Sequence, residues 1–150
     1  MRKSKESLFL ENQTVFPVYL CAKELYLTSN KLLEPYGLTY TQFLIMTYLW
    51  EVGRSSAKEA SDSLLLDPST LTPVLKKLEQ KGLITRQRDA SDERSLLIDV
   101  TKDGAALREQ VTGLPDKAAL LMGLDNDELR VLRDLTLKIL ININVEKSNA

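Results

Sequence analysis

One face of a predicted helix carries short hydroxyl and basic side chains, which suit a partner that is anionic and rich in hydrogen-bonding groups. The buried side of this helix is marked by apolar residues at three- and four-residue steps, Leu71, Val74, Leu75 and Leu78. The opposite side presents Ser69, Thr70, Thr72, Pro73, Lys76 and Lys77. Short hydroxyls near a helix N-terminus let the backbone approach base edges, and the helix end itself attracts phosphate. The proline offers an apolar surface to a thymine methyl, and the lysines suit phosphate contacts that set register.

A charged hairpin is predicted directly after this helix, with the polar tip 89–94 between two short strands. Asp92 and Arg94 stand two residues apart, so they share one face of an extended tip. The carboxylate can then hold the guanidinium straight, ready to enter a narrow minor groove. Arg86 and Arg88 would flank it towards the DNA backbone. A polar helix face or a charged tip alone is typical of a solvated surface, but the helix, the spacing and the hairpin together indicate DNA recognition.

The helices and strands around the polar helix and the charged hairpin predict a mainly α (α+β) fold, a winged helix-turn-helix. Apolar periodicity and capping signals indicate helices over residues 14–33, 40–51, 56–64, 68–81, 101–112 and from 125 onward, and strands over 83–88 and 95–100. Thr39 with Gln42, and Asp125 with Glu128, have the spacing of a capping box. In the last helix a 3,4,3,4 seam is formed by Leu129, Leu132, Thr136, Ile139 and Ile143.

Composition excludes several classes of protein. The formal net charge of the 150 residues is −1, so any electrostatic footprint for nucleic acid must be local. Histidine is absent and cysteine occurs once, which removes His-based triads, Cys/His zinc sites and an intrachain disulfide. Without a Gly-rich phosphate loop either, we expect no enzyme, no metal and no cofactor. No apolar run could span a bilayer and no signal-peptide core follows the basic start, so we expect no membrane partner and a cytoplasmic protein.

The sequence resembles the MarR family of winged-helix regulators, and within it the organic-peroxide sensors of the OhrR type. The matching segments are LENQ (10–13), LTY (38–40), LWE (49–51), LD (66–67), TLTP (70–73), LKK (75–77), GLITR (82–86) and DERS (92–95). The Asp-x-Arg of the hairpin and the Leu-Thr-Pro of the helix are the specific signals. The match covers residues 10–112 well, and the last helix only by pattern.

The resemblance implies an obligate homodimer that binds double-stranded DNA at a pseudo-palindromic operator, acts as a repressor, and is released by a small-molecule or oxidative signal. It also implies a single domain over residues 1–150. In that domain, residues 8–36 and 113–146 would be interlocking dimerisation helices, and 38–112 the DNA-binding winged-helix lobe.

This chain differs from the peroxide-sensing branch at the position of the reactive cysteine. The peroxide-sensing branch has a reactive cysteine two residues after the Glu-Asn-Gln-type segment, and Val15 stands there in this chain. A tyrosine that would hydrogen-bond the thiol is retained as Tyr40, and a second is replaced by Ser29. Cys21 lies roughly 120° around the helix from Val15, so it does not reach the same pocket. A small buried residue is one interpretation of Cys21, and a redox-active thiol is the other.

Three further hypotheses remain open. A small apolar or phenolic effector could lodge between the dimerisation helices and the winged lobe, against Val15, Tyr19, Tyr26, Tyr40, Phe43 and Trp50. Ordinary core packing explains the same aromatic residues. Other classes of function are a thiol-based redox protein acting through Cys21, and a winged helix used for protein–protein contacts.

Overall fold

The computed structural model describes residues 9–91 and 95–149. The chain divides into two compact units, Met1–Thr112 and Gly113–Ala150. No helix in the described ranges combines the length and the apolar content that a membrane span requires.

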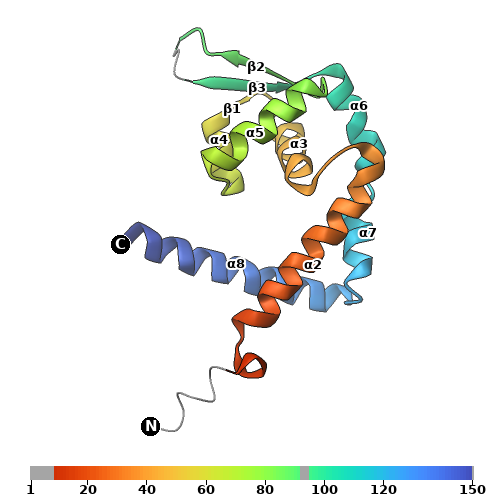
Figure 1. Cartoon of the computed structure of the whole chain (residues 1–150), viewed down its shortest axis with the longest axis vertical. Helices are drawn as coiled ribbons and strands as arrows, with labels where there is room; N and C mark the ends of the chain where they lie inside the picture. Colours follow the sequence, from red (N-terminus) through yellow and green to blue (C-terminus); the bar gives the residue numbers. More distant parts are fainter. Residues whose placement is uncertain (1–8, 92–94, 150) are drawn as a thin grey trace. The chain divides into compact units, whose positions relative to one another are not determined.

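The first unit is mainly helical with a small sheet, as the sequence predicts (Figure 1). In chain order its elements are η1 Leu10–Asn12, α2 Val15–Leu33, η2 Glu34–Tyr36, α3 Tyr40–Val52, β1 Ser55–Ser56, α4 Ala57–Leu64, α5 Pro68–Gln80, β2 Ile84–Arg88, β3 Leu96–Val100 and α6 Lys102–Val111. The predicted helices and both predicted strands of this unit are therefore present, each within one or two residues of its predicted ends. β1 was not predicted, because two residues are too few for a period-two pattern.

The sheet is antiparallel with the order β1-β3-β2. Ile84 pairs with Val100 and Arg88 with Leu96, which fixes the hairpin register. Beyond the last pair, the Asp89 N–H donates to the Ser95 carbonyl at 2.9 Å. The predicted tip residues Asp92 and Arg94 lie outside the described residues.

Local capping signals decide where the helices of this unit begin. Thr39 and Gln42 form the predicted capping box at α3: the hydroxyl accepts from the Gln42 N–H at 3.3 Å, and the Gln42 amide oxygen accepts from the Thr39 N–H at 3.1 Å. Ser56 and Glu59 form a second box at α4, which the sequence analysis missed. Pro17 lies in the first turn of α2, where its missing N–H removes no helical hydrogen bond.

The core of the first unit lies between α3, α5, α6 and the sheet. Its fully buried side chains include Ile45, Met46 and Leu49 of α3, and Leu75 and Leu78 of α5. Leu71 is also buried and Val74 is half-buried, so the predicted stripe does face inward. Four large side chains of α3 are only half-buried: Phe43, Leu44, Tyr48 and Trp50.

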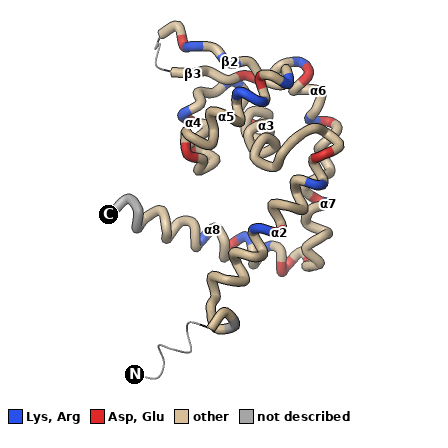
Figure 2. Tube along the Cα trace, viewed as in Figure 1, with Lys and Arg blue, Asp and Glu red and all other residues tan. Residues whose placement is uncertain are grey.

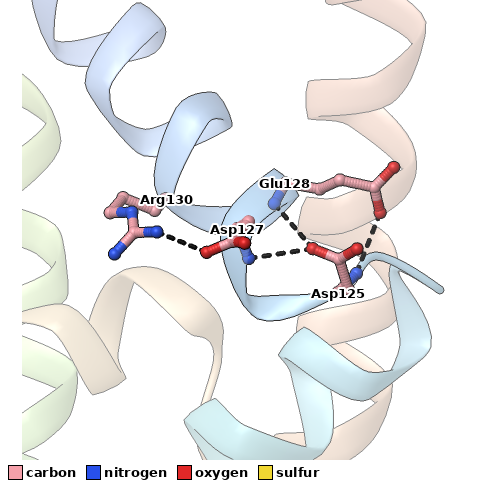
Figure 3. Close-up of polar contacts among 4 residues, drawn as sticks. All are labelled: Asp125, Asp127, Glu128 and Arg130. Carbon is pink, nitrogen blue, oxygen red and sulfur yellow. Dashed lines mark hydrogen bonds and ion pairs between the residues drawn. The ribbon is translucent and has the colours of Figure 1, made fainter.

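The second unit contains α7 Leu114–Leu121 and α8 Asn126–Asn149. Asp125 and Glu128 form the predicted box at the start of α8, with two reciprocal bonds of 2.9 Å (Figure 3). Asp125 also accepts from the Asp127 N–H at 2.8 Å, and Asp127 pairs with Arg130. Three hydrogen bonds that involve Asp125 therefore stabilise the start of α8.

The α4 box makes acid stability depend on Glu59, because this carboxylate accepts three hydrogen bonds. The donors are the Ser56 N–H at 2.8 Å, the Ser56 hydroxyl at 2.9 Å and the Ser55 hydroxyl at 3.0 Å. These bonds, the Ser56 N–H first, lower the pKa of Glu59 below its ordinary value of 4.5. The stabilisation is therefore complete above about pH 4.5 and is lost as pH falls through the lowered pKa.

We therefore expect Glu59→Gln to reduce the loss of stability that acid causes. Chemical denaturation at pH 7 and pH 3 measures it: the free energy of unfolding should fall by less between these values in the variant than in the parent. Equal falls in parent and variant would contradict this account.

Candidate nucleic-acid interface

Helix α5 turns a polar face to solvent because its leucines face the core. Asp67 occupies the N-cap position, and its carbonyl accepts from the N–H groups of Thr70 and Leu71, both at 2.9 Å. Pro68 follows at the first helical position, where no N–H is needed. Every predicted contact residue on this helix is exposed: Ser69, Thr70, Thr72, Pro73, Lys76 and Lys77.

The first turns of this face offer chiefly acceptors and helix N–H groups. The Thr72 hydroxyl donates to the Pro68 carbonyl at 2.8 Å, so its oxygen keeps its lone pairs for a donor in a ligand. Pro73 lies inside the helix with its ring exposed. This end of α5 therefore suits amino groups, phosphate oxygens and methyl groups.

Basic side chains extend the face towards the hairpin, and Figure 2 shows the Lys and Arg positions along α5 and β2. Lys76, Lys77 and Arg88 are exposed. Arg86 has a different place: its Nε and Nη2 both donate to Glu79 Oε2, at 2.9 and 2.6 Å. This pair joins α5 to β2 across an interface that sequence spacing could not reveal, so the structure gives the Arg86 guanidinium a protein partner.

Four of the six predicted effector residues form a row of ring contacts. The ring centroids of Tyr26 and Tyr40 are 6.2 Å apart, those of Tyr40 and Phe43 6.4 Å, and those of Phe43 and Trp50 6.4 Å. The Trp50 Nε1 donates to the Gly104 carbonyl at 3.0 Å. The row therefore runs from α2 through α3 to α6 and contributes packing to the first unit.

The other two predicted effector residues are apart from this row. Val15 and Tyr19 lie in the N-terminal part of α2 and are 76% and 61% exposed. A groove of about 550 Å³ lies between α2, η2 and the start of α3, and its lining is a different set of residues: Glu24, Leu27, Thr28, Asn30, Lys31, Glu34, Gly37, Leu38 and Thr39. The structure therefore does not bring the six predicted residues into one pocket.

Comparison with known proteins decides the family. Residues 28–111 match the family described as transcriptional regulator SarA/Rot, which is more than half of the chain. The chain is 38% identical over 133 residues to the organic hydroperoxide resistance transcriptional regulator of Bacillus subtilis, covering 89% of this chain and 90% of that protein. It is 34% identical to the HTH-type transcriptional regulator MgrA of Staphylococcus aureus, with 87% and 90% covered.

Two solved structures of other proteins are similar to this chain in fold. Reduced AbfR bound to DNA superposes with a TM-score of 0.78 at 30% identity, over 95% of this chain and 99% of that one. A variant of MarR from E. coli complexed with operator DNA gives 0.72 at 26% identity, over 82% and 90%. The chain is a MarR-family winged-helix transcriptional regulator. The predicted resemblance and fold class are confirmed.

Within the MarR family, the position of the single thiol of this chain is informative. Cys21 is exposed on α2, so the interpretation of a small buried residue is wrong for the single chain. The physical reason is that α2 has one buried residue, Leu33 at its C-terminal end. Val15, at the position of the peroxide-sensing cysteine, carries no thiol.

Among the described residues there is no group of three or more Cys, Asp or Glu side chains arranged to hold a metal ion. The chemistry that α5 and the hairpin offer is hydrogen bonding and charge.

Proposed function

We propose that this MarR-family regulator is a homodimeric repressor that binds a pseudo-palindromic operator and is released by a small-molecule or oxidative signal. The observation that carries the proposal is the exposed face of α5, where hydroxyls and lysines stand on the side opposite a buried leucine stripe. This recognition helix would enter the major groove, and the β2–β3 hairpin, or wing, would reach the flanking minor groove.

The proposed dimer is supported by apolar surface that neither unit covers by itself. On α2 the exposed large apolar residues include Val15, Val18 and Tyr19. On α8 they are Val131, Leu135, Leu137, Ile139, Leu140, Ile141, Ile143 and Val145. So many exposed large apolar side chains on one helix are typical of a protein–protein interface. A dimer would place two recognition helices roughly 34 Å apart, the separation of successive major grooves.

Two substitutions test the contact surface. Arg94→Ala should weaken operator binding by about tenfold or more, and Lys76→Ala should weaken binding to all sequences and lower the salt slope by about one. Fluorescence anisotropy with a labelled duplex at several salt concentrations measures both effects. Lys117→Ala, in α7, is the matched control, and it should bind like the parent.

Parental affinity and slope in both test variants would overturn the assigned surface. Absence of salt-dependent binding by the parent itself would favour a winged helix used for protein–protein contacts.

The proposed signal has its own test. The exposure of Cys21 favours an oxidative signal, because a sensing thiol must be reached by its oxidant. Alkylation at neutral pH in native buffer measures this: a thiol that stays unreactive in the dimer would remove both the redox signal and the thiol-based redox protein. A small apolar or phenolic effector held by the aromatic row is the remaining candidate.

A further inference from the structure

A lysine at the end of the recognition helix donates hydrogen bonds to a distant part of the same unit, although its side chain remains exposed. Lys81 is the C-cap residue of α5. Its ammonium donates to the Gly37 carbonyl and, at 2.8 Å, to the Gln42 side-chain oxygen. Gly37 belongs to the η2–α3 connection and Gln42 to the first turn of α3, both about forty residues earlier in the chain. The bonds therefore join the far end of α5 to another part of the first unit.

One of the two acceptors of the Lys81 ammonium, Gln42, is held in place by further hydrogen bonding. Gln42 is only 3% exposed, and its oxygen also accepts from the Thr39 N–H in the α3 capping box. Asn30 of α2 accepts from the Tyr40 N–H at 2.7 Å, one residue further along the chain. A single polar junction therefore holds α2, the start of α3 and the end of α5 together.

A lysine side chain is well suited to make these two hydrogen bonds. An ammonium offers three donors on a long stem, so it reaches two carbonyl-type oxygens at once. Partial burial, and then the neighbouring Lys77, lower the pKa of Lys81. Lys76 and Lys77 lie on the polar face of α5 opposite its buried leucines and are the proposed phosphate contacts.

We propose that Lys81 is a positioning residue for DNA recognition, which holds the C-terminal end of α5 against the α2–α3 junction and so sets the angle at which α5 meets DNA. This inference rests on the proposed function, since it assumes that α5 is the recognition helix. Lys81 acts through Gly37 and Gln42 and makes no contact with phosphate. Any movement of α2 at the junction would reach α5 through the same bonds.

The test compares Lys81→Met with the parent in operator binding over a range of salt concentrations. The variant should lose about tenfold in affinity, within the range typical of coupling through a packed network, and should keep the parental salt slope. Lys81→Arg retains donors and a positive charge and should recover most of the affinity. Lys31→Met is the matched control for loss of an exposed lysine charge near the junction, and it should bind like the parent.

A double-mutant cycle with Gln42→Met separates positioning from general loss of stability. Gln42→Met also removes the capping bond to the Thr39 N–H, so the double variant is compared with the sum of the two single losses. If the Lys81–Gln42 bond positions α5, the loss of affinity in the double variant should be clearly smaller than that sum. Active concentrations are set by stoichiometric titration, so that a poorly folded fraction does not mimic a weak affinity.

Three results would overturn the inference: parental affinity in Lys81→Met, a salt slope lower by about one, which would mark Lys81 as a phosphate contact, or additive losses in the cycle. Failure of the parent to bind DNA at all would instead overturn the proposed function, and this inference with it.

Discussion

Replacing Gly104 by alanine is expected to lower the free energy of unfolding by about 3 kcal/mol, the upper part of the range for overpacking a core. An added Cβ would lie 2.1 Å from the Leu83 carbonyl oxygen and 2.9 Å from a methyl of Val100. The first contact is with backbone, which cannot swing aside as a side-chain end can. Helix α6 would have to move away from the sheet, and the Trp50 bond to the Gly104 carbonyl would break.

Thermal and denaturant unfolding measure the loss, which corresponds to a fall in melting temperature of roughly 6–12 °C for a chain of this size. The emission of Trp50, the single tryptophan, reports the local change. Gly113→Ala is the matched control, because its added Cβ meets nothing within 4 Å and its φ of −85° suits any residue. A Gly104→Ala protein as stable as Gly113→Ala would refute the close approach of α6.

Replacing Ile139 by glutamate is expected to raise the dissociation constant of the proposed dimer by about 100-fold or more. Ile139 is 48% exposed on α8 and belongs to the predicted seam with Leu132 and Ile143. Burying an unpaired carboxylate costs several kcal/mol, and each 1.4 kcal/mol is about tenfold in a binding constant. Sedimentation velocity measures the association. Operator affinity should fall with it, since a monomer presents one recognition helix.

Two controls isolate the interface. Lys138→Gln changes the net charge by the same amount at the neighbouring exposed position, and Ile139→Leu keeps the apolar volume. Both should sediment like the parent, and circular dichroism should show unchanged helix content in all three variants. Ile139→Glu chains that sediment like the parent would remove α8 from the interface.

Agreement between sequence and structure is best where the cause of an element lies within one turn of chain. The boxes of Thr39 with Gln42 and Asp125 with Glu128 were predictable because donor and acceptor are three residues apart. The start of α5 was predictable from Asp67-Pro68, since the proline determines its own φ. The exposed face of α5 followed from the leucine spacing, because a helix that buries one stripe must expose the opposite one.

Contacts between distant segments escaped the sequence analysis. Arg86 was assigned to DNA, and the structure pairs it with Glu79. Lys81 was not singled out, although it joins α5 to the η2–α3 connection. Trp50 bonds to a carbonyl 54 residues away. No spacing rule reports these bonds, because they depend on how whole elements pack.

The sequence by itself therefore determined the order of the main helices and of the two hairpin strands, the polar face of α5 and the family, because each depends on neighbouring residues or on a set of short motifs. Only the tertiary structure decided which of the basic side chains face solvent and which brace the fold. It also decided that Cys21 and much of α2 and α8 are exposed in the single chain. The physical reason is that burial and charge pairing depend on which surfaces meet, and that is set by the packing of the whole chain.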